Sequence, residues 1–430
     1  MIQTCDILLQ NITYLDATMT PQSAACMAIT NGTIVHIGDS SSWQGTTTIN
    51  SAGLLWMAGL QDGHTHTSQQ LLRGRLLDEK PVIWKRINVP FESKLTAQES
   101  TLSASVAAVE MIRSGTTAFV DVGGHHVEAF AQVYHQSGLR GILSYMTNDN
   151  PAMPESLRTT PAQALARQSQ LHRDLQGTLL QGACSFTAPT AASQEMMETM
   201  CGYAKEQNLL METHTNEYAS EVMDFIEKYG ARPYEWFEHQ DLLGGRFLGA
   251  HGIFLSPSEM DIIAKHRVTI AHCPFSNCGK GVPSTPQLLS RGISVGFGSD
   301  GAAHGGLDLF QEMRLFRGVM NVTHGVQTAD PQVMPAKQIL KMATQGIAPA
   351  FNIPQLGTLT VGAPADCIAI DTQQLHLLPT QNITNSLVES GRGSDVTHMI
   401  VNGKLLMENR HLTTLDEEKI RYEAVKYSHI

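Results

Sequence analysis

The chain has few charged residues and no excess of basic ones. Only 16% of its 430 residues are Asp, Glu, Lys or Arg, and the formal net charge is -11. No basic stripe offsets this charge, which argues against a nucleic-acid partner, because binding to a phosphate backbone depends on clustered Lys and Arg. Hydrophobic residues make up 42% of the chain, which is typical of a soluble globular protein with a large core.

Long hydrophobic runs are also missing. No uninterrupted apolar run approaches the roughly 20 residues that are needed to cross a bilayer. Residues 1–6 lack the basic segment and apolar core of a signal peptide. The seven cysteines are an odd, scattered set, which fits reduced thiols better than a disulfide framework. We therefore expect a cytoplasmic protein that does not span a membrane.

Short strand-like runs separated by turns fill both ends of the chain. They cover residues 6–10, 25–29, 33–37, 357–370 and 399–406. The dipeptide Asn31-Gly32 joins two of them and is a strong hairpin signal. We predict one β-sandwich domain built from residues 1–57 and 357–430, with a helix over 417–427 that packs on the outside.

The middle of the chain alternates apolar strands with helix-like stretches. Strands are predicted over 117–121, 209–214, 269–272 and 294–298, and helices over 97–114 and 221–229. Repeated β-then-α units favour a parallel sheet closed as a (β/α)8 barrel. We assign residues 58–356 to this TIM-type barrel, which gives the chain an α/β fold with a catalytic barrel and a smaller sandwich.

His64-Thr-His66 ends the strand-like run that begins at Ala58. Residues i and i+2 of a strand point to the same face, so both imidazoles can reach one metal ion. A single His-x-His pair is weak evidence, but His214, His251 and Asp300 also stand where short apolar runs stop. In a (β/α)8 barrel such positions meet at the C-terminal ends of the strands, where the chemistry gathers.

Three imidazoles and one carboxylate form a donor set that suits zinc or another borderline divalent ion. Zinc lowers the pKa of its bound water to ~7 and so supplies hydroxide at neutral pH. Glu217, three residues after His214, can stay near the metal without ligating it and move the proton of the water. Alternatively, Glu217 is an acid favoured by a helix N-terminus. His251 polarises the substrate or holds the water in this scheme.

Two other motifs in this region have weaker interpretations. Gly296-Phe-Gly-Ser-Asp-Gly301 matches the dinucleotide fingerprint, but Asp300 occupies the turn where a pyrophosphate would sit and no acid follows about 20 residues later. Cys273 and Cys278 lack the second cysteine pair of a thiolate zinc site, so we interpret them as packing residues. His272, at a strand end, is predicted to contact substrate or to support the site from behind.

Together these motifs resemble the amidohydrolase superfamily, in the branch of triazine chlorohydrolases and methylthioadenosine/S-adenosylhomocysteine deaminases. The resemblance runs through 57–66, 71–74, 114–117, His214 with Glu217, 251–252, 272–277, 298–301 and 357–366. It implies one divalent metal, zinc or else iron, bound by His64, His66, His214 and Asp300, with Glu217 and His251 assisting. It also implies no carboxylated lysine, and residues 182–187 offer no lysine for that role.

The resemblance is less informative about the substrate. Glu92 looks like the counterpart of a glutamate that binds ribose hydroxyls in deaminases of adenosine derivatives; the alternative is a solvated charge before a helix. The His-x-Pro of the family stands here as Thr187-Ala-Pro189, and Tyr145 lies near the place of an expected arginine. We therefore predict that Glu92, Tyr145, Thr187 and His272 surround a small neutral heterocycle.

Three functions remain open at this point. The first is hydrolytic deamination of an amino-substituted N-heterocycle, such as a purine derivative, guanine, a pterin or a triazine. The second is chlorohydrolysis or cyclic-amide hydrolysis on the same scaffold. The third is a catalytically silent metal-binding protein, which has no physical need for the acid at Glu217. We also expect a homo-oligomer.

Overall fold

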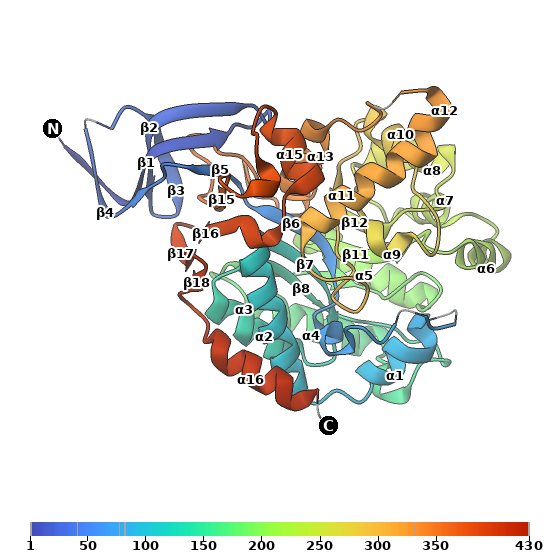
Figure 1. Cartoon of the computed structure of the whole chain (residues 1–430). Helices are drawn as coiled ribbons and strands as arrows, with labels where there is room; N and C mark the ends of the chain where they lie inside the picture. The colour runs from blue at the N-terminus through green and yellow to red at the C-terminus, as the bar shows by residue number, and fades with distance from the viewer. Residues whose placement is uncertain (1, 41, 77, 81–82, 331, 429–430) are drawn as a thin grey trace.

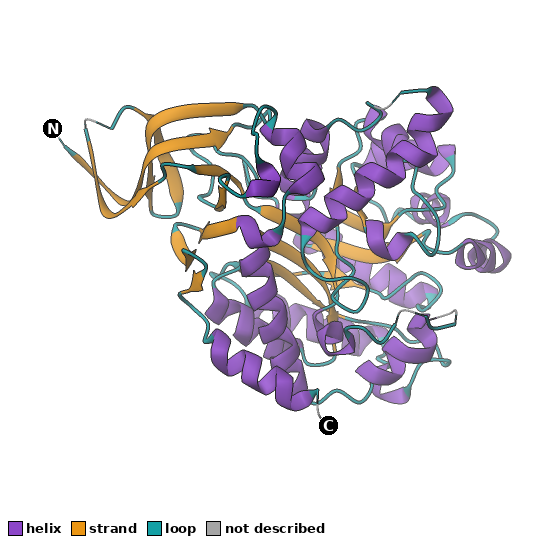
Figure 2. Ribbon diagram, in the orientation of Figure 1, coloured by secondary structure: helices purple, strands orange, loops and turns teal. Residues whose placement is uncertain are grey.

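The computed structural model describes residues 2–40, 42–76, 78–80, 83–330 and 332–428, which form a barrel and a second β-sheet (Figures 1 and 2). Nine strand segments line the barrel: β6 (Leu60–Thr65), β7 (Thr116–Gly124), β8 (Arg140–Tyr145), β9 (Leu180–Gly182), β10 (Cys184–Ser185), β11 (Leu210–Thr215), β12 (Arg246–His251), β13 (Thr269–His272) and β14 (Val295–Phe297). Only Ala183 separates β9 from β10, so these two act as one interrupted strand.

The barrel closes because β14 pairs with β6 and every neighbouring pair is parallel. Counting β9 and β10 as one gives the eight positions of the predicted (β/α)8 barrel, and this prediction is confirmed. Ala58 ends a strand of the other sheet, and the barrel strand begins at Leu60. Gly59 makes the passage between the sheets, where a Cβ atom would lie 2.0 Å from Thr117 Oγ1.

Helices surround the barrel (Figure 2). The longer ones are α2 (Ala97–Ser114), α3 (Val127–Ser137), α4 (Pro161–Asp174), α5 (Gln194–Gln207), α6 (Ala219–Tyr229), α7 (Pro233–His239), α8 (Pro257–His266), α11 (Leu309–Met320) and α13 (Ala336–Gln345). The shorter ones are η1 (Thr67–Leu72), η2 (Trp84–Asn88), α1 (Val89–Glu92), η3 (Glu155–Leu157), α9 (Pro274–Asn277), α10 (Thr285–Ser290), η4 (Asn321–Gly325), α12 (Val326–Thr328) and α14 (Ala348–Phe351).

Local sequence sets the ends of α2, whose bounds are those predicted. Thr96 accepts a hydrogen bond from Glu99 N while the Glu99 side chain accepts one from Thr96 N, so two free backbone donors of the first turn are satisfied. Gly115 ends the helix in the left-handed region at φ 91°, which glycine adopts without steric cost.

The second sheet combines both ends of the chain. Its strands are β1 (Gln3–Leu15), β2 (Pro21–Thr30), β3 (Thr33–Gly38), β4 (Trp43–Asn50), β5 (Leu54–Ala58), β15 (Cys367–Asp371), β16 (Val396–Val401), β17 (Lys404–Glu408) and β18 (His411–Leu412). β5 pairs with β15, which joins the N-terminal and C-terminal strands as predicted, and the continuous sheet is consistent with the predicted sandwich. Asn31 (φ 49°) and Gly32 (φ 75°) make the predicted hairpin turn.

The C-terminal residues also cover the barrel. The helix α15 (Ile383–Ser390) packs on α11 and α13, and α16 (Glu417–Tyr427) packs on α2, as the sequence predicted for 417–427 (Figure 1). The short helices η5 (Leu375–Leu377) and η6 (Gly393–Asp395) complete this region. The division at residues 57 and 357 stays a prediction. Within the described ranges, no helix is long and apolar enough to cross a membrane.

A buried ion pair ties the two parts together. Arg140, at the start of β8, donates from Nε to Asp366 Oδ2 at 2.6 Å and from a second nitrogen to Asp366 Oδ1 at 3.1 Å. Asp366 also accepts a hydrogen bond from Asn402 N at 2.7 Å. Because these bonds satisfy both carboxylate oxygens, the pair fixes the sheet against the N-terminal end of the barrel strand β8.

Candidate metal centre and active site

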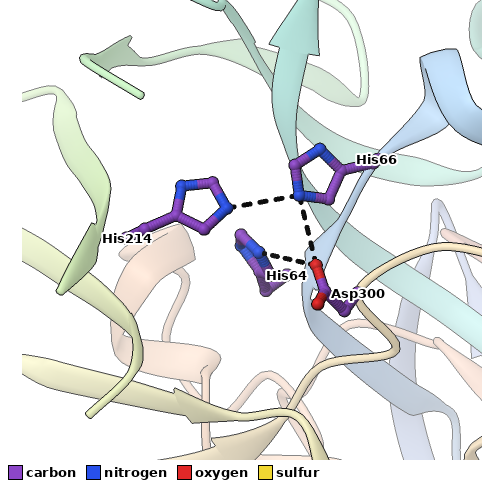
Figure 3. Close-up of side chains that lie close together, drawn as sticks. All are labelled: His64, His66, His214 and Asp300. Atoms are coloured by element: carbon purple, nitrogen blue, oxygen red, sulfur yellow. Dashed lines mark hydrogen bonds and ion pairs between the residues drawn. The ribbon is translucent and has the colours of Figure 1, made fainter. Parts of the chain in front are cut away.

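Four candidate metal ligands converge at the C-terminal end of the barrel (Figure 3). His64 lies in β6 and His66 directly follows it, His214 lies in β11, and Asp300 follows β14. Their potential donor atoms all lie within 4.8 Å of one another. Asp300 Oδ1 is 3.3 Å from His64 Nε2 and 3.2 Å from His66 Nε2, and His214 Nε2 is 3.3 Å from His66 Nε2.

The donor chemistry of this cluster fits a divalent cation. His64 is fully buried, and neither of its ring nitrogens makes a hydrogen bond of acceptable geometry. His214 donates from Nδ1 to the main-chain oxygen of Thr187 at 2.5 Å, which leaves the Nε2 lone pair directed at the cluster. Burial lowers the pKa of His64 and brings that of His214 to about 4, so both rings are neutral, the form that binds metal.

Asp300 supplies the negative charge of the cluster. Burial would raise the pKa of its carboxyl, but the charges of His304 and Lys280 hold that pKa well below its usual range. Oδ2 accepts a hydrogen bond from Ser276 Oγ, so Oδ1 is the oxygen that faces the imidazoles. Asp300 has φ 57° and His251 has φ 72°, a left-handed conformation that is uncommon for residues other than glycine and concentrates at functional sites.

Glu217 lies beside the cluster at the entrance to α6. Its Oε1 is 2.6 Å from Lys280 Nζ and 3.7 Å from His251 Nε2, and the residue is only 7% exposed. Burial would raise the pKa of Glu217, but its electrostatic interactions with His251 and Lys280 bring it to about 2. The carboxylate is therefore ionised and able to accept a proton.

His251 is held from behind by an amide. Its Nδ1 lies 2.9 Å from Asn277 Oδ1, so the ring donates there and keeps Nε2 free on the side of Glu217. Asn277 in turn approaches His272 Nδ1 at 3.3 Å. His272, which the sequence predicted either to contact substrate or to support the site, therefore lies behind His251, with its ring 5.1 Å from that of Phe316.

A cavity of about 170 Å³ opens onto the cluster. Glu92, from α1, and Thr187, which the sequence predicted to contact substrate, both line it. Tyr145 does not: its hydroxyl group bonds to Glu128, and Arg167 packs on its ring at 4.2 Å. The sequence placed Tyr145 at a strand end but not the direction of its side chain.

Sequence reasoning missed several cavity residues. Lys280, Tyr218, Glu221, His304 and Trp84 all line the cavity. Lys280 stands three residues after the motif 272–277, and Tyr218 directly follows Glu217, so closeness to a recognised motif was the available signal. The residue type alone gives no indication of whether a side chain points toward the cavity.

Known proteins match almost the whole chain. The family model described as the amidohydrolase family matches residues 55–406. The chain is 32% identical to a 5-methylthioadenosine/S-adenosylhomocysteine deaminase of Syntrophobacter fumaroxidans, covering 98% of this chain and 97% of that protein. It is 31% identical to a 5'-deoxyadenosine deaminase of Methanosarcina barkeri, with the same coverage of 98% and 97%.

Solved structures share the fold. A zinc-bound adenosine deaminase from Xanthomonas campestris superimposes with a TM-score of 0.92 at 24% identity, covering 100% of this chain and 99% of that one. An atrazine chlorohydrolase from Arthrobacter aurescens in complex with zinc gives a TM-score of 0.89 at 20% identity, covering 98% and 99%. At these identities the likeness concerns the architecture, which agrees with the predicted barrel.

Proposed function

Because this chain belongs to the amidohydrolase family, as its motifs predicted, we propose that it is a hydrolytic deaminase of an amino-substituted N-heterocycle. The observation that carries the proposal is the position of Glu217, an ionised and buried carboxylate beside a cluster of three imidazoles and Asp300. The two relatives described above, at 32% and 31% identity, are named deaminases, which favours deamination over chlorohydrolysis and over a silent metal-binding role.

The cofactor in this proposal is one divalent ion per chain, zinc or else iron. His64, His66, His214 and Asp300 would hold it, since they offer three imidazole nitrogens and one carboxylate oxygen. When bound, such an ion supplies Lewis acidity that makes water a nucleophile near neutral pH. Zinc in two structural relatives supports this assignment.

Glu217 transfers the proton in this proposal, and His251 orients the water. Glu217 takes a proton from the attacking water and returns it to the ring nitrogen or the departing amine, so that the C–N bond breaks and ammonia leaves. His251 keeps its Nε2 lone pair toward the same space, 3.7 Å from Glu217, and accepts a hydrogen bond that orients the water. Asn277 fixes the tautomer that this role needs.

Glu92 is proposed to contact a substrate hydroxyl through one oxygen. Its Oε1 already accepts hydrogen bonds from Ser68 Oγ at 2.6 Å and Gln69 Nε2 at 3.0 Å. Those two bonds occupy the lone pairs of Oε1, which leaves Oε2 for the ligand. A carboxylate with both oxygens free could pair with two ribose hydroxyls at once. With only Oε2 available, we propose a single contact.

We propose that Thr187 lies next to the substrate and that its main-chain carbonyl supports the metal centre. Its carbonyl holds His214, and its hydroxyl adds a neutral group to the cavity wall. Among the described residues that line the cavity there is no arginine to pair with a substrate carboxylate, and the charge of Lys280 is already paired with Glu217. We therefore expect S-adenosylhomocysteine, which carries one, to be a poor substrate.

The test is ammonia release from a panel of methylthioadenosine, S-adenosylhomocysteine, guanine and a pterin, with chloride release from a chlorinated triazine measured in parallel. Ammonia from at least one amino-heterocycle supports the proposal. Chloride release without ammonia from any compound would instead identify a chlorohydrolase. If S-adenosylhomocysteine is the best substrate, the interpretation of Thr187 and of the missing arginine is wrong.

The cellular location and the oligomeric state are also proposals. We propose a cytoplasmic location, which the unpaired state of the seven cysteines supports, since six of them are buried as free thiols. We also propose a homo-oligomer, for which exposed apolar side chains such as Met223 on α6 and Val322 and Val326 beyond α11 offer surface. Light scattering of the purified protein measures the oligomeric state directly.

A further inference from the structure

Lys280 places an ammonium group inside the cavity. Its side chain is 8% exposed and follows the short helix α9. Nζ is 2.6 Å from Glu217 Oε1 and 2.7 Å from Ser276 Oγ. Of the described residues around the cavity, Lys280 is the only Lys or Arg, whereas Glu92, Glu217, Glu221 and Asp300 are acidic.

One hydrogen of this ammonium group is free for a ligand. An ammonium group has three N–H donors, and two are used by Glu217 and Ser276. Asp300 Oδ2 lies at 3.7 Å, beyond hydrogen-bond range, and the ring of Tyr218 lies at 5.5 Å. The third donor of Lys280 therefore has no hydrogen-bond partner among the described groups that surround it.

Glu217 and Lys280 together form an acceptor next to a donor. The acceptor oxygen and the donor nitrogen are 2.6 Å apart. In a ring lactam the N–H nitrogen and the neighbouring carbonyl oxygen are about 2.2 Å apart, from bond lengths of about 1.3 and 1.2 Å. The two spacings allow two parallel hydrogen bonds. The ring N–H donates to the Glu217 carboxylate, and the Lys280 ammonium group donates to the ring carbonyl. A ring that has C–H in place of C=O leaves the buried N–H donor of Lys280 unpaired. The site therefore discriminates against such a ring.

We propose that the pair Glu217–Lys280 selects amino-heterocycles in which one ring nitrogen joins the amino-bearing carbon to a ring carbonyl. Guanine and the pterins have this edge, and adenine-type rings have C–H at that place. The proposal rests on the proposed deaminase function and names its substrate class. Lys280 contributes a hydrogen bond and no covalent step: water adds at the amino-bearing carbon, the C–N bond breaks, and ammonia leaves.

The first test compares kcat/KM for guanine and a pterin with that for methylthioadenosine, in metal-loaded wild type and in Lys280→Met. Methionine keeps the length of the side chain but has no donor and no charge. The wild type should prefer the two oxo substrates, and the variant should lose about 10–100-fold of that preference. Lys265→Met, at an exposed lysine paired with Glu238, is the matched control. An equal loss for all three substrates, or a wild type that prefers methylthioadenosine, would overturn the proposal.

The second test needs no turnover. Hypoxanthine keeps the lactam edge but lacks the amino group, and purine lacks both, so calorimetric Kd values for the two compounds isolate the contact with Lys280. The wild type should bind hypoxanthine at least about 10-fold more tightly, and Lys280→Met should bind both alike. Equal Kd values in the wild type overturn the proposal, even if Lys280→Met fails to fold. If no substrate releases ammonia while hypoxanthine is preferred, the deaminase function fails and the lactam site stands.

Discussion

Replacing Glu217 by glutamine tests the role of this residue in proton transfer while keeping the ligand set and the shape of the cavity. Glu217 is not one of the four clustered ligands, so the variant should retain its metal. The amide oxygen can still accept the hydrogen bond from Lys280, which Glu217 Oε1 now meets at 2.6 Å, so the cavity keeps its shape. The amide cannot accept a proton, and turnover should fall by ~10²–10⁴.

The same change should also cost some stability. It replaces a charge-assisted hydrogen bond with Lys280 by a neutral acceptor in a buried place, and such bonds contribute about 1.5–3 kcal/mol. Asp300 Oδ2, 3.7 Å from Lys280 Nζ, continues to offset the ammonium charge. We therefore expect the free energy of unfolding to fall by no more than about 3 kcal/mol.

The assay measures ammonia release and bound metal on the same preparation, with urea unfolding as the check on folding. A variant that binds about one equivalent of metal, unfolds cooperatively and has lost 10²-fold or more of its kcat supports the assignment. Activity within a few-fold of wild type would refute it, and His251, whose Nε2 lies 3.7 Å from Glu217, would be the next group to test. Loss of metal together with activity would show instead that Glu217 supports the ligand set.

Further predictions concern the metal, the substrate, the pH response and the join between the two sheets. Metal analysis should find about one zinc or iron per chain, none after His64→Ala; two tightly bound ions would contradict a single site. Glu92→Ala should lower kcat/KM for hydroxyl-bearing nucleosides more than for free bases; equal losses would make Glu92 a structural residue. Burial raises the pKa of Glu312 from 4.5 to about 8, so the folded state holds a proton that the unfolded state has lost, and stability falls as pH rises through that window. Glu312→Gln, which can still accept from Phe275 N, should therefore gain stability relative to wild type between pH 5 and 8 in urea titrations. Asp366→Asn should cost about 3–5 kcal/mol in the same assay, because it leaves Arg140 buried without its charge partner.

The predictions that held depend on short-range regularities. The helix over 97–114 was predictable because its cap residues, Thr96 and Glu99, and its stop at Gly115 are neighbours in the chain. The hairpin at Asn31-Gly32 follows from the positive φ that its turn requires. The strand ends that carry His64, His66 and His214 were recognisable because a strand alternates with period two, and barrel topology brings such ends together.

The sequence pattern does not indicate the direction of individual side chains, which only the structure shows. Tyr145 stands at the end of β8, but a hydrogen bond to Glu128 and packing against Arg167 draw it away from the cavity. Glu92 lines the cavity, and Ser68 and Gln69 donate hydrogen bonds to one of its oxygens.

The sequence by itself determined the family, the barrel and the four candidate ligands, because strand period, helix caps and short motifs such as His64-Thr-His66 each lie in a few consecutive residues. Only the tertiary structure decided that Lys280 turns to Glu217, 63 positions earlier in the chain, and forms an acceptor–donor pair with it. The physical reason is that a charged side chain takes its direction from the partners that folding brings within hydrogen-bond range. Those partners lie on other strands and loops, and no local sequence pattern indicates them.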